Sequence, residues 1–406
     1  MKNKLFLALG ILLIVSLACS FSGNNNSGLT NDEIIATSVA ATRESETEAA
    51  PVDPPVDPTV EPDYLLPQSL YYRAESSPEI FQVWRLERDG VTITQITNEI
   101  VSVGNYTVNP VNGRVAYIVD NQIFLIDADG TNRMMLIDGG PVDESSNVFI
   151  YLERIRTVSW SPDGNILAYG RGGLNFYNFT TGLSELLIPS ETIDYGGGSI
   201  GPQALYDPST WSPDGSQIIV SVAWLEGGTL SIYTPSTDTN LVLGYGITCC
   251  DYDWSQAGDF IVVGSPVLGL IESGLWRYDA VTGAETILLP TEALDGTYNF
   301  AGWPKELPNG DLVFFYHNMP ESGDYDPPLT MVHTAADGIT GLFQVRPESW
   351  ENYEALWDDA GVMAILVQPA PGPLSWPRTG AIVLVDTLGN PVLPLVPQGF
   401  DLQWGP

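Results

Sequence analysis

One five-residue motif occurs twice in the sequence, and its recurrence constrains the fold more than any other feature. Trp-Ser-Pro-Asp-Gly stands at residues 160–164 and again at residues 211–215, 51 positions later. In both copies an apolar run ends at the Trp and another begins soon after the Gly. Pro presets φ, Asp can bond its own backbone and Gly tolerates a positive φ, so the motif predicts a tight turn between two strands. A hairpin repeated at this period indicates a repeat architecture.

Weaker copies of the motif extend the series in both directions. They are anchored at Val108, Trp254, Trp303, Trp357 and Trp404. Together with the two full copies they place six of the eleven tryptophans at one position of the repeat. Successive anchors are 43 to 54 residues apart. Among the complete hairpins, only the one after Trp303 is much lengthened, over residues 304–310.

A second marker, a short polar turn, alternates with the first. It stands at residues 88–90, 127–130, 180–182, 236–238, 281–283, 336–338 and 387–389. Asp-Gly and Thr-Gly between β-rich runs are hairpin signals. Both markers count seven units, and each unit holds four short β-rich runs. The sequence therefore predicts an all-β fold, a seven-bladed β-propeller of four-stranded antiparallel blades.

The two ends of the repeat region predict how the propeller closes. The first unit begins near residue 69 without a preceding Trp strand, and the chain finishes on a Trp strand, residues 399–404, with no unit after it. We expect the C-terminal strand to complete the first blade, which removes exposed sheet edges. The propeller domain is then residues 68–406.

These repeats resemble a known family. The Trp-Ser-Pro-Asp-Gly hairpin, the Ile-Leu-Ala-Tyr run at residues 166–169 and the segment 124–132 resemble the TolB-type WD40-like propeller repeats. The resemblance covers roughly residues 69–406. It implies the propeller fold and a general expectation of protein binding, but no particular functional residue. The segment before the propeller lacks the length and periodicity of TolB's N-terminal α/β domain.

The N-terminus has the pattern of an export signal. Lys2 and Lys4 precede the almost unbroken apolar run of residues 5–17, which is shorter than the about 20 residues that a membrane-spanning helix needs. Ser16-Leu17-Ala18-Cys19 then resembles a bacterial lipobox, although Leu is usual where Ser16 stands. We expect residues 1–18 to be a lipoprotein signal peptide and Cys19 to carry the lipid. Ordinary secretion and a retained anchor are the alternatives.

A spacer is expected between the lipid and the propeller. Residues 19–67 are rich first in Ser, Asn and Gly and later in Pro and acidic residues, a composition that stays extended and solvated. Residues 30–49 could form one short helix, which would be marginal by itself in water. The predicted location is extracytoplasmic, with the chain held at the cell envelope or cell surface by its lipid.

The charge of the chain excludes some classes of partner. The formal net charge is −35, and without residues 1–18 the chain has 13 basic and 50 acidic residues, a charge of −37. Nucleic-acid binding depends on Lys and Arg neutralising phosphate, so nucleic acid is an unsuitable partner. The same charge argues against docking on an anionic membrane, which leaves the lipid as the only membrane contact. Solubility outside the cell is one explanation of the charge and cation binding is another.

Few residues suggest catalysis or metal binding. Gly-x-Ser-x-Gly at residues 197–201 lies in an inter-blade loop and lacks the strand and helix of a hydrolase elbow. His317 and His333 are the only histidines, and we expect neither a metal site, nor a cofactor, nor catalytic residues. Cys249 and Cys250 are adjacent and either form a vicinal disulfide or remain two reduced, buried residues.

Loop lengths point to one face of the propeller. Most long insertions are expected on the face opposite the Trp hairpins, where a rigid scaffold would gather them into a site. Aromatic and acidic side chains in these loops are candidates for ligand binding: Tyr195, Trp224, Glu226, Asp324, Tyr325, Asp326 and Trp376. We expect a non-catalytic module that binds an envelope or extracellular protein or glycan. The alternatives are a glycan-processing hydrolase or lyase using carboxylates near the axis, a purely structural protein, and loops that bind nothing.

Overall fold

The structure is a computed structural model that describes residues 64–142, 150–196, 200–224, 227–244, 251–268, 272–320, 327–369 and 377–406. Residue contacts divide the chain into two units, Met1–Pro62 and Asp63–Pro406, and every described residue belongs to the second. The predicted signal peptide, Cys19 and most of the predicted spacer lie outside the described residues. Among the helices that are described, none has the length and apolarity needed to cross a membrane.

The described part of the chain is almost entirely β, as predicted. Five of its sheets have four antiparallel strands. These are β4 (Tyr106–Val108), β5 (Val115–Val119), β6 (Gln122–Ile126) and β7 (Met134–Asp138); β8 (Val158–Trp160), β9 (Ile166–Gly170), β10 (Gly173–Asn178) and β11 (Leu183–Pro189); β14 (Leu205–Trp211), β15 (Ile218–Trp224), β16 (Gly227–Thr234) and β17 (Thr239–Val242); β18 (Asp251–Trp254), β19 (Phe260–Ser265), β20 (Gly274–Asp279) and β21 (Glu285–Leu289); and β22 (Tyr298–Glu306), β23 (Leu312–Met319), β24 (Leu329–Thr334) and β25 (Phe343–Trp350).

A larger sheet joins the two ends of this unit. Its seven strands lie in the order β26 (Glu354–Trp357), β27 (Met363–Pro369), β28 (Gly380–Asp386), β29 (Leu393–Gly405), β1 (Ser69–Ser77), β2 (Ile80–Leu86) and β3 (Ile93–Gln95). The first half of β29 pairs with β28, where Gly380 lies opposite Gly399. The second half pairs with β1, where Ser69 lies opposite Gly405. The last of the described strands is therefore hydrogen-bonded to the first.

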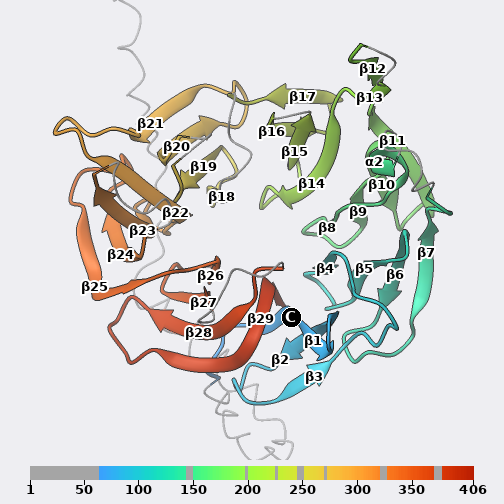
Figure 1. Ribbon diagram of the computed structural model, residues 1–406, viewed down its shortest axis with the longest axis horizontal. Coiled ribbons are helices and arrows are strands. Elements are labelled where there is room, and N and C mark those ends of the chain that lie inside the picture. Colours follow the sequence, from blue (N-terminus) through green and yellow to red (C-terminus); the bar gives the residue numbers. More distant parts are fainter. Residues whose placement is uncertain are drawn as a thin grey trace, which may run out of the picture. The chain divides into compact units, whose positions relative to one another are not determined.

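Within the unit the sheets follow one another around a common centre (Figure 1). In each four-stranded sheet the first strand lies nearest the centre, and the last strand, such as β7 or β17, lies at the periphery (Figure 1). Three of these first strands, β8, β14 and β18, end at the repeated Trp, and β22 contains it, whereas β4 ends at Val108. The anchor position of the repeat therefore lies on the innermost strand of each four-stranded sheet (Figure 1).

The repeated motif forms the turn that the sequence predicts. Between β8 and β9 the Ser161 hydroxyl bonds the Asp163 carboxylate at 2.6 Å, and the Ser161 backbone N–H donates to the Ile166 carbonyl at 2.9 Å. Gly164 closes the turn with φ of +69°, a conformation that favours glycine. The second copy repeats the Ser–Asp bond between Ser212 and Asp214 at 2.7 Å. The prediction of a strand, a tight turn and a second strand is confirmed.

The repeated Trp side chains pack between consecutive sheets. Trp211 ends β14, and its ring centroid lies 5.1 Å from that of Phe176 in β10 of the preceding sheet. Trp357 ends β26, and its ring centroid lies 5.5 Å from that of Phe315 in β23. Burying a side chain such as Phe contributes about 1.5–3 kcal/mol. The tryptophan at this position is therefore a structural residue that joins neighbouring sheets.

Hydrogen bonds from the indole nitrogens strengthen some of these contacts. Nε1 of Trp254 donates to the Thr210 carbonyl (3.2 Å), that of Trp357 to the Trp303 carbonyl (2.8 Å) and that of Trp404 to the Trp357 carbonyl (2.7 Å). Trp160 and Trp211 differ, because their buried Nε1 atoms have no partner among the described residues. The packing role of the Trp thus recurs around the unit, whereas the hydrogen bond is made by only some of the copies.

Three elements lie outside the repeated pattern of four strands per sheet. Helix α2 (Ile150–Glu153) is a single turn before β8. Strands β12 (Thr192–Asp194) and β13 (Ile200–Pro202) form a two-stranded sheet, so the expectation of a loop at residues 197–201 is wrong at its C-terminal end, where Ile200 and Gly201 are paired. The Gln203 backbone N–H donates to the Glu191 carbonyl at 2.7 Å and continues this ladder. The Tyr195 hydroxyl donates to the Pro202 carbonyl at 2.7 Å and ties the two strands together.

Candidate functional site

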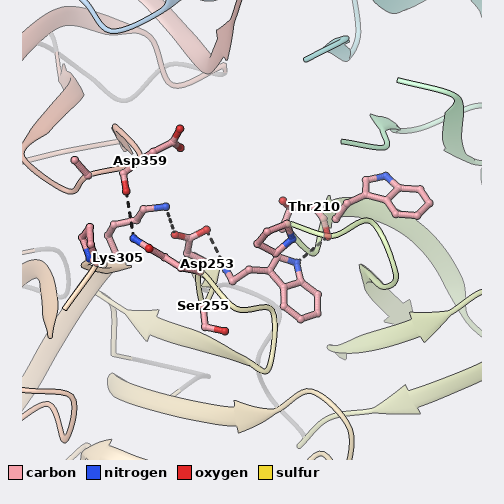
Figure 2. Close-up of a pocket in the computed structure, with 11 residues that line it drawn as sticks. Thr210, Asp253, Ser255, Lys305 and Asp359 are labelled. Carbon is pink, nitrogen blue, oxygen red and sulfur yellow. Dashed lines mark hydrogen bonds and ion pairs between the residues drawn. The ribbon is translucent and has the colours of Figure 1, made fainter. Parts of the chain in front are cut away.

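Two adjoining cavities, each of about 550 Å³, lie among the inner strands and the Trp hairpins. The first is lined by Thr210, Trp211, Pro213, Asp253, Trp254, Ser255, Gln256, Lys305, Pro308, Asp359 and Ala360 (Figure 2). The second is lined by Ser209, Asp251, Tyr252, Asp253, Trp303, Pro304, Lys305, Glu354, Ala355, Leu356, Trp357, Asp359, Leu402 and Trp404. Asp253, Lys305 and Asp359 line both. We call the two together the axial cavity.

An ion pair stands where the two cavities adjoin. Nζ of Lys305 lies 2.8 Å from Oδ2 of Asp253, and Figure 2 shows the lysine reaching across to the strand that carries the aspartate. Asp253 directly precedes the repeated Trp of β18, whereas Lys305 lies in β22. The other oxygen of Asp253 accepts a hydrogen bond from the Trp254 backbone N–H at 3.0 Å. Two neighbouring sheets are thus linked by a charged contact inside the cavity.

An irregular strand brings Lys305 into this position. In β22 the register with β23 shifts between Gly302 and Lys305, and Trp303 adopts a φ of +50°. A bulky residue at positive φ is strained, and such strain is held in place by the surrounding structure. The strand then continues to Glu306 before turning over residues 307–310. This irregular strand leads into the turn that is lengthened in the sequence, and it places a basic side chain in the cavity.

Burial changes the titration of the carboxyl group in this pair. Desolvation raises the pKa of Asp253 above its usual value, although the Lys305 ammonium acts in the opposite direction. The negative charge of Asp359 adds to the rise. Asp253 keeps 33% of its side-chain surface accessible, so it is desolvated by the walls of a cavity and not by complete enclosure. The positive charge of Lys305 therefore does not fully offset the effect of burial and of the neighbouring negative charge on Asp253.

A second group of charges borders the cavity at the junction of β26 and β29. The Glu354 carboxylate accepts hydrogen bonds from the backbone N–H groups of Asp401 (2.7 Å) and Leu402 (2.6 Å). Asp401 has φ of +58°, and its carboxylate lies 2.9 Å from Nε of Arg73 in β1. The Tyr106 hydroxyl donates to the Asp401 carbonyl at 2.6 Å. These contacts connect β26, β29, β1 and β4.

The carboxyl groups of this second group are hard to ionise. Burial, followed by the charge of Asp401, raises the pKa of Glu354 to about 7. Burial also raises the pKa of Asp401, against the opposing effect of Arg73. A raised carboxyl pKa in a cavity is a known mark of functional sites, but structural ion-pair networks produce it as well. Here the Glu354 carboxylate accepts two hydrogen bonds, whereas the Asp401 carboxylate is held by its ion pair with Arg73 without hydrogen-bond geometry.

Of the residues that the sequence suggested for ligand binding, two are described. Tyr195 is exposed and belongs to the hairpin of β12 and β13. Trp224 ends β15, and its ring lies partly buried next to Gly227. Neither residue lines the axial cavity. The other candidates lie outside the described residues: Glu226, Asp324, Tyr325, Asp326 and Trp376, together with Cys249 and Cys250.

The sequence did not point to Asp253, Lys305 or Asp359. Lys305 had one usable signal, because it is a rare basic residue within the only much lengthened Trp hairpin. Asp253 and Lys305 are 52 residues apart, so nothing local in the sequence pairs them. In the described part of the chain no group of three or more His, Cys, Asp and Glu residues could hold a metal ion. Nε2 of His333 lies 3.2 Å from Oδ2 of Asp311.

Comparisons with known proteins bear on the fold. No family model matches the sequence, and no curated protein matches it. Among solved structures, a puromycin hydrolase S511A mutant complexed with PGG is 15% identical with a TM-score of 0.54, over 83% of this chain and 53% of that chain. Oligogalacturonate lyase in complex with manganese is 10% identical with a TM-score of 0.50, over 80% of this chain and 84% of that chain.

TolB from Acinetobacter baumannii is also similar, at 14% identity and a TM-score of 0.41, over 83% of this chain and 82% of that chain. The propeller fold is supported by the puromycin hydrolase and oligogalacturonate lyase structures, whose TM-scores are 0.54 and 0.50. This chain spans about half the length of the puromycin hydrolase chain that it matches. At such low identities the likeness concerns the fold alone. In fold, the described part of this chain is a β-propeller.

Proposed function

We propose that this protein is a non-catalytic binding module at the outer side of the cell, which recognises a protein or a glycan. One observation carries the proposal: the carboxylates of raised pKa at the axis already have bonding partners. Asp253 is paired with Lys305, Glu354 accepts two backbone N–H groups and Asp401 is paired with Arg73. Groups held in this way stabilise a scaffold, which supports a binding module over an enzyme.

The alternative is a glycan-processing hydrolase or lyase that uses carboxylates near the axis. Glycoside hydrolysis needs two carboxyl groups about 5–9 Å apart across a cleft, one protonated and one free to attack or to activate water. The raised pKa of Glu354 is the feature that favours this alternative. Turnover of acidic or neutral oligosaccharides by the purified chain, abolished in Glu354→Gln, would establish the enzyme and reject the binding module.

The proposed architecture is a closed ring of seven blades. Five four-stranded sheets support five of the blades. The seven-stranded sheet supports two more if β29 serves both, as the outer strand of one blade through Gly399 and the inner strand of the next from Phe400. Cryo-electron microscopy of a complex large enough to image, or a crystal structure, would count the blades directly.

The proposed location depends on the N-terminal segment. We propose cleavage after Ala18, lipid on Cys19 and a spacer over residues 19–67. The lipid would be the only contact with a membrane, and nucleic acid is not expected as a partner. Fractionation of cells that express the wild type and Cys19→Ala tests this. The wild type should sediment with membranes and the variant should be soluble, whereas equal sedimentation would contradict the lipid anchor.

The proposed binding surface is the face with the long loops, through Tyr195, Trp224, Glu226, Asp324, Tyr325, Asp326 and Trp376. Capture from envelope extract by the full chain should fall when Trp224 and Trp376 are both changed to Ala. Leu388→Ala provides a control, since this exposed side chain lies in a polar turn of the kind expected on the opposite face. Equal capture by all three proteins would reject this surface while leaving the axial cavity open to test.

A further inference from the structure

We infer that the axial cavity binds the primary ammonium group of a ligand, next to Asp359 and in competition with Lys305. The inference rests on the proposed binding function and names the ligand chemistry of a second site, away from the predicted long-loop surface. It is carried by the charge of the cavity, by the lysine already seated there and by the aromatic walls.

The cavity holds more negative than positive charge. Four of its lining residues are carboxylic acids: Asp251, Asp253, Glu354 and Asp359. Among the described residues that line it, Lys305 is the only lysine or arginine. Glu354 is partly protonated near neutral pH because its pKa is raised to about 7, and Lys305 offsets one of the other three carboxylates, so a net negative charge remains. A cation therefore gains energy by entering the cavity, and an anion loses it.

The side chain of Lys305 shows that an alkylammonium group fits in the cavity. Its ammonium lies 2.8 Å from Asp253, with 17% of its side chain accessible, so a primary ammonium at the end of an alkyl chain is already accommodated. Asp359 lines the same cavity and affects the titration of Asp253 through its charge. Among the described residues the carboxylate of Asp359 has no hydrogen-bond or ion-pair partner, and only its backbone carbonyl accepts a bond, from Gln256 at 3.5 Å. Asp359 is thus available to a second ammonium.

Aromatic side chains form much of the remaining wall. Tyr252, Trp303, Trp357 and Trp404 all line the second cavity. Aromatic faces attract cations, at about 0.5–1 kcal/mol for exposed sites and more when the cation is desolvated. The same rings offer apolar surface to the methylene groups of an alkylammonium. A strongly hydrated metal ion would gain nothing from these walls, whereas an organic cation uses both the charge and the apolar surface.

The test is a ligand-observed NMR titration of the full chain at constant ionic strength. The probes are n-butylammonium, the neutral 1-butanol and N-acetyl-lysine N-methylamide. We expect saturable binding of both amines and at least about tenfold weaker binding of the alcohol, as loss of a charge-assisted contact implies. Tighter binding of the lysine derivative would assign the site to a polypeptide ligand, and tighter binding of butylammonium to a free amine. Equal binding of butylammonium and butanol overturns the inference.

Two variants with opposite expectations locate the site. Asp359→Asn should weaken amine binding about fivefold, because it removes one exposed carboxylate. Lys305→Met should tighten it about fivefold, because it removes the competing ammonium. Glu185→Gln is the matched control, since it removes one negative charge from the exposed strand β11 and should change nothing. Unchanged affinity in both cavity variants rejects the site, and thermal unfolding curves verify that each variant is folded.

This outcome is separable from that of the proposed function. If amines do not bind while the Trp224 and Trp376 variant loses its captured partner, the binding module stands and the axial site fails. If amines bind and the purified chain also cleaves oligosaccharides, the axial site stands and the non-catalytic proposal fails.

Discussion

The indole N–H of Trp404 donates a hydrogen bond to the Trp357 carbonyl at 2.7 Å. The donor is the last repeated Trp in the chain and the acceptor is the one before it. This bond joins the inner end of β29 to the end of β26. It therefore reinforces the junction at which the C-terminal strand reaches the centre of the unit.

Removing this hydrogen bond should cost stability. Trp404→Phe keeps an aromatic ring but deletes the donor, so we expect a loss of about 1 kcal/mol beyond the effect of the smaller ring. Trp160→Phe is the matched control, because the Nε1 atom of Trp160 is buried without a partner in the described structure. Urea unfolding of the two variants measures the difference. An equal loss in both would mean that ring packing alone determines the contribution of the Trp.

Glu354 should make the stability depend on pH. Its pKa rises from 4.5 to about 7 on folding, so the folded state holds the proton more tightly than the unfolded state does. The stability that this group contributes is complete below pH 4.5 and is lost as the pH rises through about 7. We expect the free energy of unfolding to fall by about 3 kcal/mol over this range through this group alone.

Glu354→Gln isolates this effect. The glutamine side-chain oxygen can still accept a backbone N–H from Asp401 or Leu402, but the side chain does not titrate. Unfolding free energies between pH 4.5 and pH 7.5 should depend less on pH in the variant, whereas Glu185→Gln should keep the wild-type slope. Identical slopes in all three proteins would place the titrating group elsewhere.

The ion pair in the axial cavity should be worth more than a surface pair. Lys305→Met leaves the Asp253 carboxylate desolvated and without its cation, which we expect to cost about 2 kcal/mol. Asp253→Asn together with Lys305→Met removes both charges and should recover much of this loss. A double-mutant cycle by urea unfolding gives the coupling between the two residues. A coupling near zero would show that solvent screens the pair despite its position.

Gly173 should tolerate no side chain. It begins β10 with φ of +136°, and a Cβ atom would lie 2.0 Å from the backbone oxygen of Ile188. We expect Gly173→Ala to cost about 3 kcal/mol or more, since strain and a clash with backbone add. Gly389→Ala is the control, because Gly389 also has a positive φ (+82°) but a Cβ there would have no described atom within 4 Å. Thermal unfolding compares them, and similar losses would mean that β10 can shift to relieve the clash.

Much of the fold could be predicted because it is encoded locally. The Ser-Pro-Asp-Gly turns depend on contacts within five residues, such as the one between Ser161 and Asp163, and these leave a readable pattern. The hairpin of β12 and β13 was missed because its three-residue strands have little apolar alternation. The φ of Gly173 was missed because it results from the approach of β11, which no local pattern records.

The candidate site was harder to predict, for a physical reason. The Asp253 carboxylate and the Lys305 ammonium come from strands of different sheets, and the spacing of the repeat does not determine which side chains face each other across the centre. The strained Trp303 that aims Lys305 inward is visible in the sequence only as a lengthened turn. The aromatic and acidic loop residues that we predicted as ligand contacts were chosen by residue type. Residue type alone does not determine whether a side chain lines a cavity.

The pairing of β29 with β1 has a consequence for synthesis. A ribosome adds about 5–20 residues each second, so Ser69 is made long before its partner Gly405. Throughout that interval one edge of β1 has no partner strand, and it is satisfied only when residues 400–405 have been made. A nascent chain that stalls before residue 400 would expose this edge to other polypeptides. Residues 400–405 therefore protect β1 from edge-to-edge pairing with other chains.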